Sequence, residues 1–278
     1  ELNVGQYERV IVLAPSHQMG FEGLSIPAVE AFTVPLGLIP VDGKAIGHLN
    51  YCSLINLRGV SYTNKRRPPL HETETSVENV LPFLLERMGP FFLVPILVGD
   101  LKDLDGHYSA ARIEAVADAI RGIMDEKTLL VVSTDFTHYG NDFSFRPFSE
   151  NVSENIEQLD RQAIDLVIKR DFDGFIKYLE KTHNPICGQA ALLILMKLLP
   201  EQARGQAMDH RADIFAIGVI LHTALRWHAR LALALVAIAG VGGAFCYAPR
   251  HDPVAFLVLW FSTILLVAAY IVIVPFLA

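Results

Sequence analysis

The chain has 278 residues, a formal net charge of −7 and a hydrophobic content of 52%. An acidic balance without a long basic run argues against nucleic acid as a partner. Its three cysteines, Cys52, Cys187 and Cys246, are too few and too scattered for a disulfide framework. The first residues lack the basic and apolar segments of a secretory signal, so we expect a cytoplasmic, reducing setting for the polar part of the chain.

Three short apolar runs predict buried β-strands, at Val10–Ala14, Phe92–Val98 and Leu129–Ser133. The segments between and after them have helical periodicity: apolar residues recur at a spacing of three and four around 113–120 and 156–166. Strands that alternate with helices predict an α/β fold with a largely parallel or mixed sheet flanked by helices. Residues 1–225 are enough for one such domain.

Polar residues follow each predicted strand, where open α/β sheets place their functional crevice. Pro15-Ser16-His17 follows the first strand, and the segment 134–140 with Asp135 and His138 follows the third. A single histidine such as His17 is more often a hydrogen-bonded structural residue than a ligand. The combination of His17, Asp135 and His138 at strand ends makes a functional site and a structural role about equally plausible.

Cys187 lies just before Gly188–Leu199, a uniformly apolar segment that predicts a buried helix. The positive end of a helix dipole favours the thiolate, which is the form that ligates metals and acts as a nucleophile. The alternative is an inert buried cysteine, because free cysteine commonly packs as a small apolar residue.

Two apolar runs near the C-terminus predict a membrane hairpin, with spans at about 231–248 and 254–276 joined by a short polar loop. We expect this hairpin, at 226–278, to anchor the domain 1–225 to a membrane. Arg226 and Arg230 before the first run favour a cytoplasmic domain. The alternative is a buried helical hairpin of a soluble core.

The order of six motifs resembles the Memo family, which is also called protein B of the AmmeMemoRadiSam system. The resemblance covers roughly residues 8–200 and leaves out the predicted hairpin. The motifs are Val-Leu-Ala-Pro-Ser-His (12–17), Phe-Thr-Val-Pro-Leu-Gly (32–37), Glu-Thr-Ser-Val-Glu-Asn-Val-Leu-Pro-Phe (74–83), Leu-Val-Pro-Ile-Leu-Val-Gly (93–99), Ser-Thr-Asp-Phe-Thr-His-Tyr-Gly (133–140) and Ile-Cys-Gly (186–188).

The resemblance implies a fold like that of class III non-haem-iron extradiol dioxygenases, with a metal-binding cleft at the strand ends. It assigns His17 and Cys187 as metal ligands and places a further histidine at His138. The family's third ligand is a histidine in a Glu-His-Ser motif, but this chain has Thr75 at that position. Threonine is a poor ligand for iron, copper or zinc, so we expect iron or copper to bind weakly, with His71 or Glu74 as a stand-in for the missing ligand.

The resemblance also predicts differences at both ends of the domain. The family has an earlier strand and a Pro-His-Ala-Gly-Tyr-like segment before Pro-Ser-His, so we expect this chain to be a fragment without that strand. The family's Ser-Gly-Asp stretch has no clear match here, and Ile214–Leu221 is the candidate for the last strand.

Three functions are compatible with these residues, and the sequence leaves open whether the chain is an enzyme. The first is a membrane-tethered Memo-like protein that uses a redox metal for oxidation, with His138 as general base and Asp135 orienting it. The second is a degenerate, non-catalytic module that binds a small molecule or a peptide. The third is an extradiol-type dioxygenase, which Cys187 fits poorly. Family association adds a radical S-adenosylmethionine protein and an AMMECR-like protein as expected partners.

Overall fold

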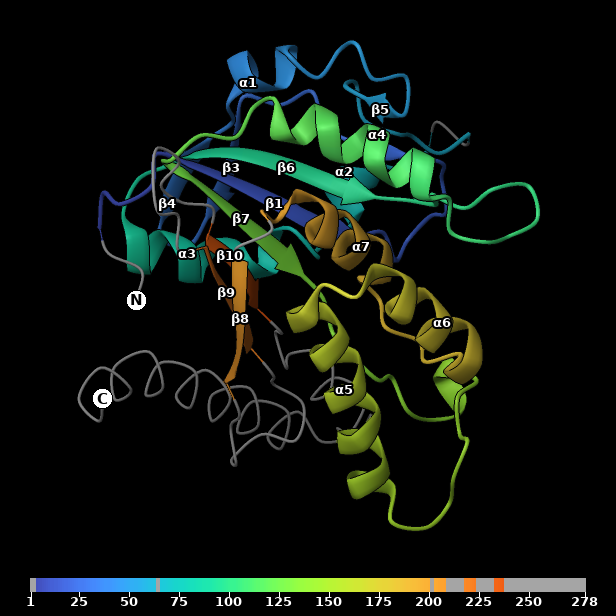
Figure 1. Ribbon diagram of the computed structural model, residues 1–278. Coiled ribbons are helices and arrows are strands. Elements are labelled where there is room, and N and C mark those ends of the chain that lie inside the picture. Colours follow the sequence, from blue (N-terminus) through green and yellow to red (C-terminus); the bar gives the residue numbers. More distant parts are fainter. Residues whose placement is uncertain (1–3, 64–65, 201–202, 209–217, 224–232, 238–278) are drawn as a thin grey trace, which may run out of the picture.

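The fold is a mixed β-sheet with helices on both faces (Figure 1). The computed structural model describes residues 4–63, 66–200, 203–208, 218–223 and 233–237. This arrangement confirms the predicted α/β class, and each of the three predicted strands is present within one residue of its expected bounds.

The eight strands of the main sheet lie in the order β5-β2-β6-β1-β7-β10-β9-β8. Its central strands run parallel to one another; they are β6 (Phe92–Val98), β1 (Arg9–Pro15), β7 (Thr128–Ser133) and β10 (Leu233–Ala237). The outer strands add antiparallel pairings at β2 with β6, β9 with β10 and β8 with β9. Their bounds are β2 (Leu24–Ser25), β5 (Ile55–Asn56), β8 (Ala203–Met208) and β9 (Gly218–Thr223). A separate hairpin consists of β3 (Ala31–Val34) and β4 (Gly37–Pro40).

Both faces of the central strands are buried, because successive side chains of a strand point to opposite sides. Ile11 and Leu13 of β1 belong to the core on one face, whereas Val10 and Val12 belong to the core on the other. A strand buried on both faces therefore appears in the sequence as a continuous apolar run.

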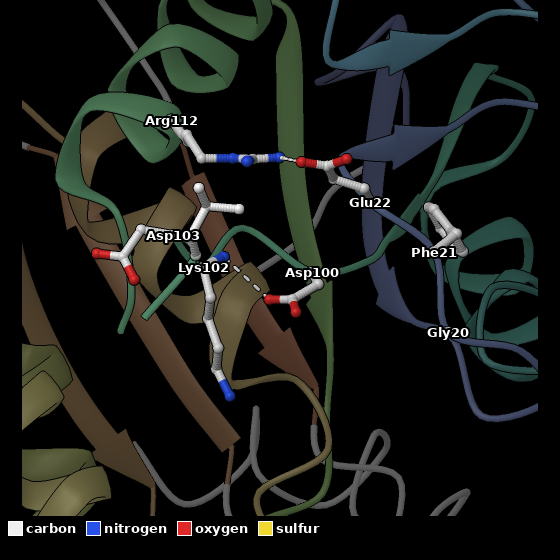
Figure 2. A pocket seen from close by; sticks show the side chains of 8 residues that line it. Gly20, Phe21, Glu22, Asp100, Lys102, Asp103 and Arg112 are labelled. Carbon is white, nitrogen blue, oxygen red and sulfur yellow. Dashed lines mark hydrogen bonds and ion pairs between the residues drawn. The ribbon is translucent and has the colours of Figure 1, made fainter. Parts of the chain in front are cut away.

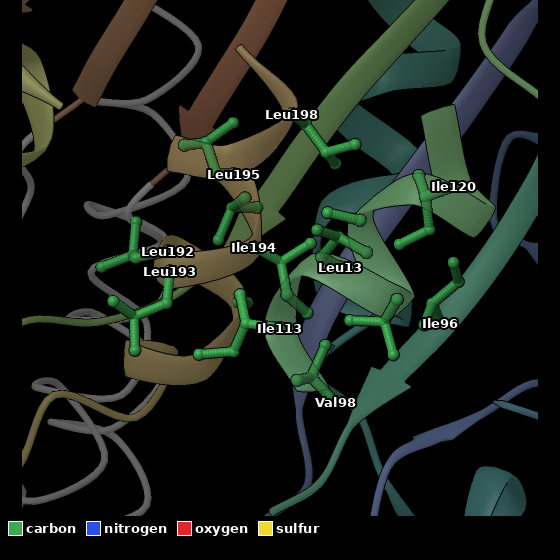
Figure 3. Close-up of a cluster of buried hydrophobic side chains, with 14 of the residues drawn as sticks. Leu13, Ile96, Val98, Ile113, Ile120, Leu192, Leu193, Ile194, Leu195 and Leu198 are labelled. Carbon is green, nitrogen blue, oxygen red and sulfur yellow. The ribbon is translucent and has the colours of Figure 1, made fainter. Parts of the chain in front are cut away.

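The larger core lies under α4 (Ala110–Arg121) and α7 (Gln189–Leu198), whose leucines and isoleucines pack against β1 and β6 (Figure 3). Helices α1 (Gly43–Gly47), α5 (Val152–Lys169) and α6 (Phe172–Thr182) add side chains to the same core. The core of the opposite face is covered by α2 (Leu70–Thr73), α3 (Leu81–Met88) and the β3–β4 hairpin. Two 3₁₀ helices complete the described helices, at Glu78–Val80 and Asn141–Phe143. The helices predicted around 113–120, 156–166 and 188–199 are confirmed as α4, α5 and α7.

The structure does not support the first predicted membrane span, 231–248. Leu233–Ala237 within it form β10, which pairs in parallel with β7. A short apolar run is compatible with a fully buried strand as well as with a helix, so hydropathy alone did not distinguish them. In the part of the chain that the structure describes, no helix is both long and apolar enough to cross a bilayer. The second predicted span, 254–276, and residues 214–217 of the predicted last strand lie outside the described residues; the rest of that strand belongs to β9.

Candidate metal site

Three potential metal ligands meet beyond the carboxyl end of β7. One ligand atom each from Asp135, His138 and Cys187 lies within 4.8 Å of the other two, and all three residues are half-buried. The sequence analysis paired Cys187 with His17 as ligands and gave Asp135 and His138 catalytic roles. The geometry instead brings Asp135 and His138 together with Cys187.

The His138 ring is held by hydrogen bonds on one nitrogen only. Its Nδ1 lies 3.0 Å from the carbonyl oxygen of Phe136 and 2.8 Å from that of Pro185. Carbonyl oxygens only accept, so Nδ1 carries the proton. The other nitrogen, Nε2, lies 3.9 Å from Asp135 Oδ2 and is the one available to a ligand. The Phe143 ring packs against the imidazole at a centroid distance of 4.8 Å.

Cys187 is fixed against the segment that follows β7. The Asp135 N–H donates to Cys187 Sγ at 3.0 Å, and the Cys187 N–H donates to the Asp135 carbonyl oxygen at 3.3 Å. The next residue, Gly188, donates its N–H to Thr134 Oγ1 at 2.9 Å. A Cβ atom on Gly188 would lie 2.4 Å from Thr134 Cβ, so the close approach of the two segments requires glycine here.

Burial affects the ionisation of Asp135. Burial raises the pKa of Asp135, although attraction to His138 and then to His17 lowers it. The carboxyl group therefore gives up its proton less readily than an exposed aspartic acid, and a cation at the site would favour the ionised form.

Glu74 organises the turn that carries His17. Its buried carboxylate accepts hydrogen bonds from the N–H groups of His17 at 2.5 Å, Gln18 at 3.2 Å, Thr75 at 3.1 Å and Ser76 at 3.2 Å. It also pairs with His17 Nδ1 at 3.0 Å. These donors overcome the effect of burial, which alone would raise the pKa of Glu74, and lower that pKa to about 2.

His17 lies beside the three-residue cluster. Its pKa is raised to about 10, first by a hydrogen bond with the Cys187 side chain and then by the bond with Glu74. His17 thus interacts with the Cys187 side chain, while Glu74 holds its Nδ1. A carboxylate behind a histidine is the arrangement that commonly orients metal-binding imidazoles.

The two expected stand-ins for the missing ligand have other partners, and Thr75 itself is exposed. Both oxygens of Glu74 bind the donors just described. His71 Nε2 lies 3.0 Å from Ser25 Oγ, and burial lowers the pKa of His71 to about 4, so this imidazole is neutral near pH 7. Neither residue belongs to the cluster of three.

A cavity of about 340 Å³ lies between the loops that follow β1 and β6 (Figure 2). Phe21 and Glu22 line it from the first loop, Lys102 from the second, and Arg112 from α4, where Arg112 pairs with Glu22. The cluster residues do not line this cavity, although both features are formed by loops at the carboxyl ends of the parallel strands.

Sequence reasoning missed two buried polar residues behind the cluster, Asp160 and Asn184, with exposures of 6% and 2%. Asp160 lies on the apolar face of α5, together with Ile156, Ala163 and Ile164. The sequence did contain a signal for Asp160, because a charged residue stands there where the helical period requires an apolar one.

The fold and the cluster define a class: an α/β protein with aspartate, histidine and cysteine gathered at the carboxyl ends of parallel strands. A family profile described as "Memo-like protein" matches residues 1–216, and the chain therefore belongs to the Memo family. This confirms the resemblance drawn from the motifs.

Two relatives illustrate the extent of the similarity. The chain is 32% identical over 197 residues to "Protein memo-1 homolog" of Caenorhabditis elegans, covering 68% of this chain and 52% of that protein. It is 27% identical over 209 residues to "Protein MEMO1" of Homo sapiens, covering 72% and 66%. The matched part thus spans between half and two thirds of the length of these relatives.

Proposed function

We propose that this Memo-family chain binds a redox metal, iron or copper, and supports an oxidation reaction at the cluster of Asp135, His138 and Cys187. The observation that carries the proposal is that one ligand atom from each residue lies within 4.8 Å of the others. When bound, such a metal would supply one-electron redox chemistry, which these side chains lack.

The donor set fits a metal in both distance and chemistry. Two ligands of one ion with bonds of about 2.0–2.3 Å are at most about 4.6 Å apart, so only small adjustments are needed to bind one ion. The separation of 3.9 Å between His138 Nε2 and Asp135 Oδ2 lies within this limit. Thiolate and imidazole favour copper, iron or zinc over magnesium or calcium.

Each residue has a defined task in this proposal. The carbonyls of Phe136 and Pro185 keep the proton on His138 Nδ1, so Nε2 is presented to the metal. This makes His138 a ligand instead of the general base that the sequence analysis expected. Glu74 orients His17 as the fourth candidate ligand. Because Thr75 supplies no strong ligand at the family's third position, we expect weak binding.

Metal titration of the full chain tests the proposal. Cys187→Ser and His138→Gln should each weaken binding of Fe²⁺ or Cu⁺ by at least about tenfold, because each removes a direct ligand. His48→Gln, at an exposed position on the end of α1, is the matched control and should bind as the wild type does. Thr75→His should raise the affinity. Equal affinity in the wild type, Cys187→Ser and His138→Gln would contradict the proposal.

The second candidate is a non-catalytic module that binds a small molecule. The cavity of about 340 Å³ between the loops after β1 and β6 favours it, since pockets for small ligands begin near 300 Å³. Arg112→Ala, at the cavity wall, should then abolish ligand binding while metal affinity is unchanged. The third candidate, an extradiol-type dioxygenase, would use His17, His138 and Asp135 without Cys187, so a loss of metal binding in Cys187→Ser would contradict it.

The proposal also includes membrane attachment and two partner proteins. We propose that the apolar run at 254–276 attaches a cytoplasmic domain to a membrane, which carbonate extraction of chains with and without residues 254–278 would test. Family association suggests a radical S-adenosylmethionine protein and an AMMECR-like protein as partners. Co-purification with each, using the Cys187→Ser chain as a comparison, would show whether an interaction depends on the metal site.

A further inference from the structure

A buried carboxylate on α5 holds the loop that carries His138. Asp160 Oδ1 accepts two hydrogen bonds from one residue, from the Thr137 N–H at 3.0 Å and from Thr137 Oγ1 at 2.5 Å. Thr137 immediately precedes His138 in the chain. The Asp160 carboxylate therefore fixes both the backbone and the side chain of the residue next to the candidate ligand.

The same threonine connects this loop to the segment that leads to Cys187. Asn184 Nδ2 donates to Thr137 Oγ1 at 2.8 Å and to the Tyr178 hydroxyl at 2.8 Å. Tyr178 in turn donates to the Leu159 carbonyl oxygen at 3.0 Å, which ties the segment back to α5. Asn184 directly precedes Pro185, whose carbonyl oxygen accepts from His138 Nδ1.

The donor and the acceptor of each hydrogen bond in this group can be assigned in only one way. The Thr137 hydroxyl gives its one proton to Asp160 and therefore accepts from Asn184, and the Tyr178 hydroxyl gives its proton to Leu159 and likewise accepts from Asn184. Asn184 must then point its amide nitrogen toward both hydroxyls. In a water-poor interior such connected bonds reinforce one another, and breaking one leaves a buried polar group without its partner.

We propose that Asp160, Thr137 and Asn184 form a positioning network that sets the place and the tautomer of His138 relative to Cys187. It acts on both segments that supply the cluster: Thr137 holds the Asp135–His138 loop, and Asn184 holds the Pro185–Cys187 segment. None of the three is itself a ligand. The inference deepens the proposed function and rests on it for the metal, but its effect on the His138 ring exists without metal.

A matched pair of variants tests the network in the full chain. Thr137→Val keeps the shape of the side chain but removes the hydroxyl that links Asp160 to Asn184. Thr137→Ser keeps that hydroxyl and should behave as the wild type. Asp160→Asn is the second disruptive variant, in case Thr137→Val fails to fold, and Asp165→Asn at an exposed position of α5 is its control.

Two measurements separate the inference from the proposed function. Long-range ¹H–¹⁵N spectra of metal-free protein, with His138 assigned through His138→Gln, should show the Nδ1–H tautomer in the wild type and in Thr137→Ser, and a tautomer mixture in Thr137→Val. Co²⁺ titration, followed by thiolate-to-cobalt absorption, should show at least about tenfold weaker binding in Thr137→Val, as expected when a group that orients a ligand is lost.

Each outcome decides one question. Wild-type tautomer and wild-type Co²⁺ affinity in both Thr137→Val and Asp160→Asn would overturn the positioning network. Absence of Co²⁺ binding in the wild type, with the tautomer change still present in Thr137→Val, would support the network and contradict the metal-binding proposal. A tautomer change with unaltered Co²⁺ affinity would also support the positioning of His138, and it would show that His138 is not a metal ligand.

Discussion

At the scale of single residues, the role of Glu74 is to close a turn. Its carboxylate receives four backbone N–H groups and the His17 imidazole, while only 4% of the residue is exposed. A buried carboxylate with this many donors is fully compensated for its lost hydration. Glu74 therefore links the stretch before α3 to the turn after β1, which carries His17.

Replacing Glu74 by glutamine should destabilise the protein. Glutamine places an NH₂ group where one carboxylate oxygen accepts, so at least one buried N–H loses its partner, at a cost of about 2 kcal/mol in the free energy of unfolding. Urea denaturation of Glu74→Gln checks this, with Glu72→Gln as the exposed control on α2. Equal midpoints for the two variants would mean that the turn does not depend on the charge.

At the scale of elements, the site depends on how closely α7 approaches β7. Gly188 allows its backbone to lie against Thr134, and this contact places Cys187 beside Asp135. The apolar side chains of α7 pack into the larger core, so the helix cannot easily move outward to relieve a clash at its first turn (Figure 3).

Gly188→Ala should therefore cost about 1–3 kcal/mol of stability, the usual penalty of overpacking. Gly47→Ala is the control, because a Cβ atom there would meet nothing within 4 Å. Thermal unfolding checks the difference, and the double variant Thr134→Gly/Gly188→Ala, which lacks the Cβ atom at position 134, should recover part of the loss. No difference between Gly188→Ala and Gly47→Ala would show that the two segments separate at little cost.

Arg9 connects elements at the opposite end of β1. Its guanidinium donates to Asp42 Oδ2 at 2.8 Å, to the Ile123 carbonyl oxygen at 2.9 Å and to Asp125 Oδ2 at 3.3 Å. Burial alone would raise the pKa of Asp42, but hydrogen bonds from the Ala45 N–H and from Arg9 outweigh it and hold that pKa below 3.8.

Because the folded-state pKa of Asp42 is lowered, its stabilising effect is present above the unfolded value and is lost as the pH falls through the folded value. Arg9→Met should lower the free energy of unfolding by about 1–3 kcal/mol at pH 7. The difference from the wild type should shrink below about pH 3.8. Urea denaturation from pH 7 to pH 2.5 measures this, with Arg58→Met as the exposed control. A difference that does not depend on pH would contradict the ion-pair explanation.

At the scale of the whole molecule, β10 joins two parts of the main sheet. It lies between β7 and β9, so β8 and β9 join the rest of the sheet through it. Residues 1–225, the bounds that the sequence analysis gave to the domain, end before this strand. Without β10, the exposed edge of β7 would offer unpaired backbone groups to other chains.

A chain ending at residue 225 should therefore unfold without a cooperative transition or aggregate, whereas a chain ending at residue 237 should keep the sheet. Circular dichroism melts and size-exclusion chromatography of the two chains distinguish these outcomes. A soluble, cooperatively unfolding chain 1–225 would instead support the domain boundary expected from the sequence.

The sequence by itself determined the elements whose patterns are local. The strands at Val10–Ala14 and Phe92–Val98 follow from continuous apolar runs, and the helix at 113–120 follows from its periodicity. The family follows from short motifs in order. The sequence did not show that residues 233–237 form a strand, because a buried central strand and part of a membrane helix are equally apolar over five residues.

Only the tertiary structure decided which side chains share a site. Asp135 and Cys187 are far apart in the chain, and their contact depends on the approach of α7 to β7 through Gly188. The sequence named His17, Asp135, His138 and Cys187 as candidates, yet it could not tell that Glu74 closes a turn or that Asp160 holds Thr137. Local patterns report how a segment alternates between core and solvent, whereas the partners of a buried polar group depend on segments that folding brings together.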